Sequence, residues 1–273
     1  MFKHDLLYDT PSYLIVLVLA ALMLAAIYAG LLYARKRNER AENTSERSGA
    51  IIAAIFALLG FILAFTYNMS ESRYDKRRQN IVEESNNIGT ALLRCDLYPD
   101  SVRNSLRAGF YHYILARIDH FDSGRDDQKA REAFERGDRY SKQLWKTATD
   151  YSKTHPTQLV ASNQMIPALN AMIDIVTTRQ ASFLATVPPL IVLMLFLLCI
   201  SAGFFSGYSI GNRKPDKAVV AGFIITISMV VFITLDLDRP YRGIITMNQV
   251  EQNIVNLQQQ FTSEEIKLYK EVK

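Results

Sequence analysis

Two phenylalanines in an uncharged segment, and a cluster of cations after them, are the residues best suited to a function. Phe61 and Phe65 are four positions apart and therefore share one face of a helix. Around a shared axis such rings would form a dry constriction, and nearby cations would concentrate anions beside it. Taken by themselves, rings on a membrane helix more often face lipid, and basic clusters often hold lipid head groups. The cations are Arg73, Lys76, Arg77 and Arg78.

Two carboxylates, Asp236 and Asp238, end the last apolar run of the chain. Carboxylates at a helix C-terminus face an unfavourable dipole, so both need partners. We expect a structural ion-pair network here, with a cation site as the alternative. The candidate members of that network are Asp174, Arg179, Arg239 and Arg242.

Bond-making chemistry has no comparable pattern in the sequence. No nucleophile elbow, P-loop, zinc finger or glycine-rich dinucleotide turn occurs. Cys95 and Cys199 lie in segments of opposite polarity, which argues against a disulfide. The net charge of +4 is modest and gives no case for nucleic acid. We therefore expect no enzyme, no cofactor and no metal ligand set. The histidines, which lack metal-ligand spacing, are His4, His112, His120 and His155.

These residues are distributed between two unlike kinds of segment. Four apolar runs are long enough to cross a bilayer as helices, and a strongly charged remainder connects them without strand alternation. We predict an all-α membrane protein with two transmembrane hairpins, a helical extramembrane domain between them and a helical C-terminal tail. The predicted spans are 13–33, 50–67, 184–205 and 218–235. The predicted parts are the first hairpin at 1–68, the helical domain at 69–180, the second hairpin at 181–238 and the tail at 239–273.

The second span continues beyond the membrane. No turn signal separates it from the basic cluster, so we predict one helix from Ala50 to about Leu97. Near-heptad apolar positions within Tyr74–Cys95 and Met247–Leu268 predict contacts between subunits. Thr262 and Glu265 form a capping box that starts a last short helix. A stripe of small residues, which lets helices approach closely in lipid, comprises Ala53, Ala57, Gly60 and Ala64.

The helix that carries these residues resembles the second membrane helix of bestrophins, and more closely that of their bacterial bestrophin-like relatives. The resemblance rests on Gly60-Phe61, on the run Asn68-Met69-Ser70-Glu71-Ser72-Arg73-Tyr74-Asp75, and on Arg77-Arg78. Two further motifs, Asn170–Asp174 with Arg179 and Leu235–Pro240, resemble motifs of the bestrophin-like group.

The resemblance implies a homo-oligomer, a pentamer, that passes inorganic anions such as chloride through a central pore. Alignment through Arg73 and Tyr74 places Phe65, Phe61 and Ala57 on the pore neck. Bestrophins carry bulky apolar residues there, so Ala57 departs from their pattern and would loosen one ring. The polar pore mouth would comprise Asn68, Arg73, Lys76 and Arg77.

Bestrophins also bind calcium near the end of their last membrane helix, through an acidic run after a Pro-aromatic-Gly element. Here Pro240-Tyr241-Arg242-Gly243 is followed by Ile244-Ile245-Thr246-Met247. We therefore predict no calcium site of that type.

Our first hypothesis is an oligomeric anion channel, a multi-pass protein of the bacterial plasma (inner) membrane whose partners are the lipid bilayer and its own copies. The alternative is a non-conducting membrane scaffold, or a sensor whose helical domain binds a partner. The orientation in the membrane stays open. The positive-inside rule places the basic loops 34–48 and 207–217 in the cytoplasm, whereas the resemblance places the helical domain, at the other ends of the spans, in the cytoplasm.

Overall fold

The structure is a computed structural model that describes residues 10–38, 45–124, 126–157, 159–211, 214–239 and 243–271. In these ranges the ordered elements are helices, and no strand occurs. The chain divides into two compact units, which we call the membrane unit (Met1–Tyr74 and Ala185–Ile245) and the helical unit (Asp75–Leu184 and Thr246–Lys273). The boundaries between the units therefore fall after Tyr74, Leu184 and Ile245, and the sequence analysis predicted boundaries at 68, 180 and 238.

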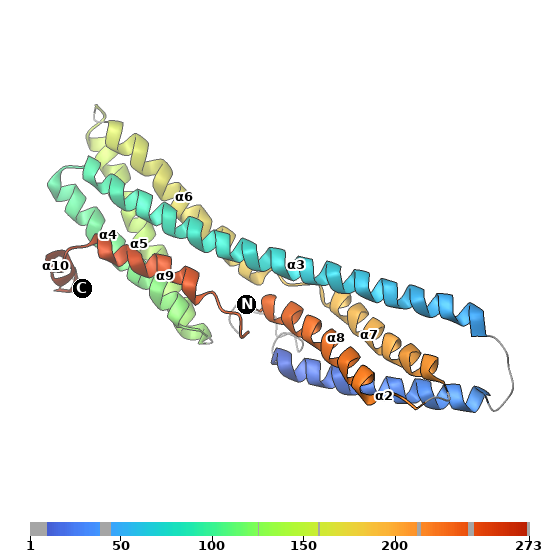
Figure 1. The fold of residues 1–273 in the computed structure, drawn as a ribbon. Helices are drawn as coiled ribbons and strands as arrows, with labels where there is room; N and C mark the ends of the chain where they lie inside the picture. The colour runs from blue at the N-terminus through green and yellow to red at the C-terminus, as the bar shows by residue number, and fades with distance from the viewer. Residues whose placement is uncertain are drawn as a thin grey trace. The chain divides into compact units, whose positions relative to one another are not determined.

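Within the described residues, four helices are long and apolar enough to cross a membrane, and they supply the membrane unit. They are α2 (Ser12–Asn38), the first part of α3 (Ser45–Leu93), α7 (Pro189–Ile210) and α8 (Lys217–Leu237). Helix α2 packs against both α7 and α8 (Figure 1). Fully buried apolar side chains fill this core, among them Met23, Cys199 and Val231. Leu59 is the buried apolar contribution of α3 to the same cluster in the described chain.

Glycines set the close crossing of α2 and α7. A Cβ added at Gly207 would lie 1.9 Å from the Ile27 carbonyl oxygen, and one at Gly30 would lie 2.0 Å from the Phe204 oxygen. Only hydrogen fits in these positions, so the two backbones touch. This is the small-residue packing expected between helices in lipid, where dispersion contacts replace the hydrophobic effect.

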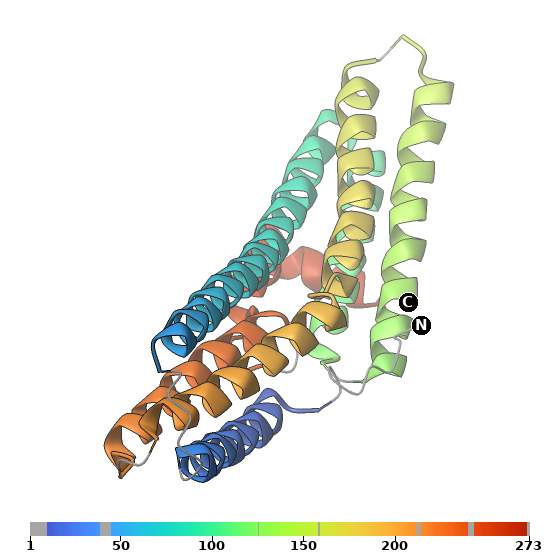
Figure 2. The same ribbon diagram turned by 90° about the vertical axis from the view of Figure 1, so that its right-hand side faces the viewer.

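The helical unit contains the rest of α3, the hairpin of α4 (Asp100–Asp122) and α5 (Asp127–Thr154), and α6 (Leu159–Leu184). Helices α4, α5 and α6 lie side by side (Figure 2). A 3-10 turn at Arg94–Leu97 ends α3, and the tail adds α9 (Asn248–Asn256), a second 3-10 turn at Leu257–Gln260, and α10 (Ser263–Glu271). The core comprises Ile81, Ile88, Leu92, Phe110, Ile114, Leu144, Met165, Leu169 and Ile254, all buried.

Several sequence predictions can be compared with these elements. The prediction of one uninterrupted helix from the second span into the polar region is confirmed by α3. The capping box is also confirmed: the Thr262 amide donates to Glu265, and the Glu265 amide donates to the Thr262 hydroxyl. The third span begins at Pro189 rather than at Leu184, which instead ends α6. Pro188 and Pro189 lack the amide hydrogens that a continuing helix needs.

The heptad positions serve the chain's own core, which corrects the prediction that they join subunits. Ile81 and Ile88 are buried in the helical unit, as are Met247, Ile254 and Phe261 of the tail. The tail is also interrupted after Asn256, so Met247–Leu268 is not one helix. Apolar spacing indicates that a face is buried, but it does not indicate which surface covers it.

Candidate functional site

One face of α3 in the membrane unit carries the predicted neck. The rings of Phe61 and Phe65 stack with centroids 6.4 Å apart and planes 14° apart. The two side chains are 65% and 51% exposed, and Ala57 and Asn68 on the same helical face are exposed too. Of the apolar window of α3, 11% is buried in the described chain, against 33% for α2 and 22% for α8. The chain itself therefore leaves this face of α3 uncovered.

The small-residue stripe of α3 is also uncovered. Ala53, Ala57 and Ala64 are exposed, and a Cβ added at Gly60 would meet no described atom within 4 Å. In lipid such stripes provide helix–helix contact surfaces. The contrast with Gly207, whose position is filled by α2, shows that this surface of α3 is available to another molecule.

The basic residues after the span have different surroundings. Lys76 and Arg78 are exposed. Arg73 is 24% exposed, and its Nη1 lies 3.9 Å from Oδ1 of Asp238. Arg77 is completely buried, and its Nε donates a hydrogen bond of 3.1 Å to the Ser182 carbonyl near the end of α6. The sequence analysis placed Arg77 in the polar pore mouth, whereas in this chain its buried cation lies at the C-terminal end of α6, where the helix dipole favours positive charge.

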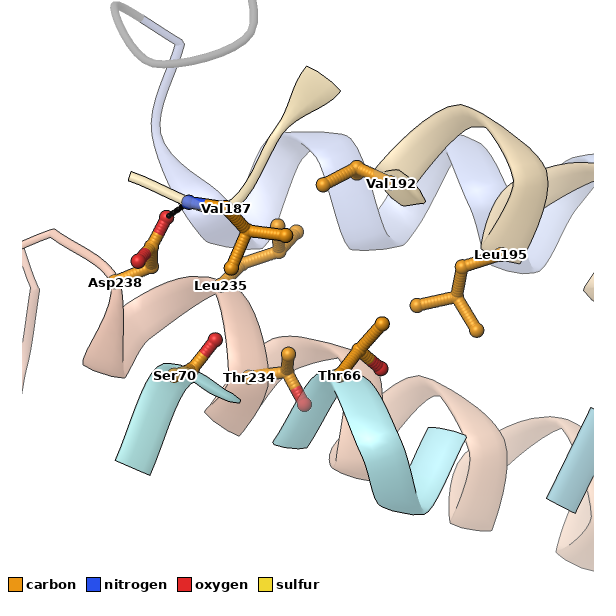
Figure 3. Close-up of a pocket in the computed structure, with 8 residues that line it drawn as sticks. All are labelled: Thr66, Ser70, Val187, Val192, Leu195, Thr234, Leu235 and Asp238. Atoms are coloured by element: carbon orange, nitrogen blue, oxygen red, sulfur yellow. Dashed lines mark hydrogen bonds between the residues drawn. The ribbon is translucent and has the colours of Figure 1, made fainter. Parts of the chain in front are cut away.

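Asp238 fixes the entry to α7. Its Oδ2 accepts a 2.8 Å hydrogen bond from the Val187 amide, which precedes α7 (Figure 3). Beside this bond a cavity of about 10 Å³ lies among apolar side chains and the hydroxyl-bearing residues Thr66, Ser70 and Thr234 (Figure 3). That volume is close to the minimum for one water molecule. Asp238 thus joins the ends of α7, α8 and, through Arg73, α3.

Asp236 accepts hydrogen bonds from the backbone of the segment that follows α8. Its Oδ2 accepts hydrogen bonds from the amides of Ile244 and Ile245, at 2.8 and 3.0 Å. A Cβ at Gly243 would lie 2.7 Å from the same oxygen, so a glycine is needed there. Arg239 donates to the Thr10 carbonyl. Arg242, a predicted guanidinium partner of Asp236, lies outside the described residues, so that ion pair stays a prediction.

The ion pairs predicted near Arg179 occur in the helical unit, with other partners. Arg179 and Arg117 both contact Glu84, each through an N–O distance of 2.6 Å. Arg179 also lies 3.5 Å from Glu251 of α9, and its guanidinium carbon is 3.9 Å from the centre of the Phe121 ring. Asp174 is exposed, and its backbone carbonyl accepts a hydrogen bond from the Thr178 hydroxyl.

The pKa values of the two acids in this cluster, Glu84 and Glu251, are shifted in opposite directions. Burial raises the pKa of Glu84, but the guanidiniums of Arg117 and Arg179 outweigh burial and hold that pKa below its ordinary value. For Glu251, burial outweighs Arg179 and raises the pKa. Glu84 is therefore an ionised centre that binds three helices together, whereas Glu251 is a weaker link to the tail.

Sequence reasoning missed most of this cluster. Glu84, Arg117 and Glu251 come from three separate helices, so no local spacing relates them. The signal that was available is helical phase: Glu84 and Arg77 share the face of Ile81 and Ile88, so they point into the helical unit.

Known proteins resemble this chain in both sequence and fold. A family model described as the bestrophin-like domain matches residues 15–251. A crystal structure of a bacterial bestrophin homologue from Klebsiella pneumoniae has 13% sequence identity and a TM-score of 0.64, covering 90% of this chain and 98% of that one. A variant of that homologue with a mutation gives 12% identity and a TM-score of 0.66, covering 89% and 98%. Among proteins with curated functions, none matches the chain.

Proposed function

The chain belongs to the bestrophin-like domain family, and we propose that it is a homo-oligomeric anion channel whose pore is lined by α3. The observation that carries the proposal is the uncovered face of α3 with Phe61 and Phe65. A membrane helix that buries little of itself in its own chain, and that carries a stripe of alanines and glycine, is suited to meet copies of itself. The family points to a pentamer in the bacterial plasma membrane.

In such an assembly, Phe61 and Phe65 form the apolar neck. Four residues along a helix span about 6 Å, so the rings of each subunit add two consecutive constrictions. Ala57 occupies the next turn, and its small side chain leaves that level wider. An apolar constriction resists filling by water, which gives the neck its gating property, and the ring edges favour anions.

The helical period continues the same face of α3 through polar residues. Asn68 follows Phe65, and Lys76 is the first exposed cation on that face. Several copies of Lys76 around one axis raise the local anion concentration. Arg73 contributes less to this anion concentration, because it forms an ion pair with Asp238 inside the membrane unit.

Oligomer mass tests the assembly that this proposal requires. The purified full chain, in mild detergent, is measured by light scattering with the detergent contribution subtracted. We expect a closed homo-oligomer with the mass of five subunits. A monomer has no central axis and would overturn the proposal in favour of a non-conducting scaffold.

A further inference from the structure

A second cavity lies in the membrane unit, at the end opposite Asp238 along α7. Its walls come from three helices: Tyr33 of α2, Ile51 and Ile52 of α3, and Phe204 and Phe205 of α7. The cavity holds about 200 Å³ of open space, twenty times the cavity beside Asp238. It is smaller than the usual pocket for a free small molecule, which starts at about 300 Å³.

A single cationic group stands among the cavity's lining residues. Arg37 lies in the last turn of α2, and its Nη1 donates a 2.5 Å hydrogen bond to the Tyr208 hydroxyl of α7. Its guanidinium carbon also lies 5.9 Å from the centre of the Tyr208 ring. Tyr33 packs against both Phe204 and Tyr208, with ring centroids 6.1 and 6.2 Å apart. The guanidinium is therefore held in place at the edge of an aromatic cavity.

The surrounding charge is positive. In the sequence, the two loops at this end of the spans, 34–48 and 207–217, carry eight Lys and Arg residues and four Asp and Glu residues. One of the four acids, Asp216, caps α8 through the Ala218 amide. The cavity lies at the ends of α2 and α7 and the start of α3, where a spanning helix meets the head-group region. Basic cavities between membrane helices at this depth suit anionic lipid head groups. The cations nearest to the ends of the described helices are Arg35, Lys36, Arg37, Lys214 and Lys217.

We propose that this cavity binds one anionic phospholipid per subunit, with the phosphate at Arg37 and the first part of an acyl chain against Ile51, Phe204 and Phe205. The walls match an acyl chain, and the fixed arginine matches a phosphate, to which guanidinium donates paired hydrogen bonds. A lipid also explains the small volume, because the rest of its chains remain in the bilayer. The bound lipid bridges α3 to the α2–α7 pair.

Native mass spectrometry of the full chain tests the proposal. Delipidated protein is titrated with phosphatidylglycerol or, separately, with phosphatidylcholine, and the lipids retained per subunit are counted. We expect one retained phosphatidylglycerol, and an affinity at least about tenfold weaker for Arg37→Gln, because a charge-assisted contact is lost. The matched control is Arg35→Gln, which removes the same charge from an exposed position of the same helix outside the cavity.

Further measurements distinguish binding of a lipid in the cavity from binding of a soluble phosphate and from a general effect of charge. Phe205→Trp fills the cavity without changing charge, and should also abolish retention of phosphatidylglycerol. In thermal unfolding, phosphatidylglycerol should raise the melting temperature of wild type but not that of Arg37→Gln. Soluble glycerol phosphate should not compete. Equal retention of phosphatidylcholine, equal loss in Arg35→Gln and Arg37→Gln, competition by glycerol phosphate, or no retained lipid in wild type would each overturn the proposal.

Discussion

The rings of Phe61 and Phe65 lie nearly parallel, 6.4 Å apart, on a face of α3 where both are more than half exposed. Two large apolar rings held in contact form one continuous surface along the helix. Repeated around an axis, that surface makes a longer constriction than a single ring would, and a longer dry segment gives a higher barrier to an ion. The two stacked rings of one chain would thus form one side of the neck in the proposed oligomer.

The charge of Lys76 is expected to set ion preference. Lys76→Glu replaces a ring of cations by a ring of anions on the proposed pore face, and should shift the reversal potential in a chloride gradient toward cation permeation. The matched control is Arg78→Glu, an identical charge reversal at an exposed position turned away from that face. Equal shifts in both variants would contradict the assigned pore face.

Glycine substitutions distinguish an intramolecular contact from one between subunits. Gly207→Ala should destabilise the membrane unit by about 1–3 kcal/mol, because the added methyl meets the Ile27 carbonyl. Gly60→Leu meets open space in the chain, so it should leave the fold of one subunit intact and lower the oligomer mass. Thermal unfolding and light scattering measure the two effects. An unstable but fully assembled Gly60→Leu variant would contradict the proposed use of the stripe.

The Glu84 cluster predicts an acid-sensitive helical unit. Glu84→Gln removes the carboxylate that buried Arg117 and Arg179 share, and should cost about 3–5 kcal/mol of unfolding free energy. Glu251→Gln should cost much less, because burial already disfavours the charge of Glu251. Chemical denaturation monitored by the fluorescence of Trp145, which lies in α5, compares the two variants.

The sign of the pH effect follows from the lowered pKa of Glu84. Its contribution is fully present above the unfolded value, 4.5, and is lost as the pH falls through the lower folded value. The stability of wild type should therefore fall below about pH 4.5, and Glu84→Gln should lose this part of the dependence. A Glu84→Gln variant with an unchanged acid transition would contradict the assignment.

Local patterns predicted the helices of this chain, apart from the start of α7 and the interruption of the tail after Asn256. The absence of any turn signal between Ala50 and Leu97 predicted the continuous α3, and hydropathy predicted the four spans. The same patterns placed Arg77 in the basic cluster of the pore mouth, because they considered charge and not helical phase. Counting from Ile81 and Ile88 would have shown that Arg77 faces the core.

Long-range relations could not be predicted in the same way. The contact of Glu84 with Arg179 joins positions 95 residues apart. The amides that bind Asp236 belong to a turn that has no recognisable sequence motif. Gly203 and Gly207 did carry a signal, since glycines four apart on a membrane helix are typical of close packing. The identity of the helix they meet, α2, comes from the structure.

Single-channel recording from purified protein in planar bilayers tests the central claim most directly. We expect anion current in wild type and a larger conductance in Phe65→Ala, because removal of the ring widens the neck. Leu17→Ala, which truncates an exposed side chain of α2, is the control and should leave conductance unchanged. A silent wild-type protein, or a current that Phe65→Ala and Leu17→Ala leave equally unaltered, would contradict a pore lined by α3.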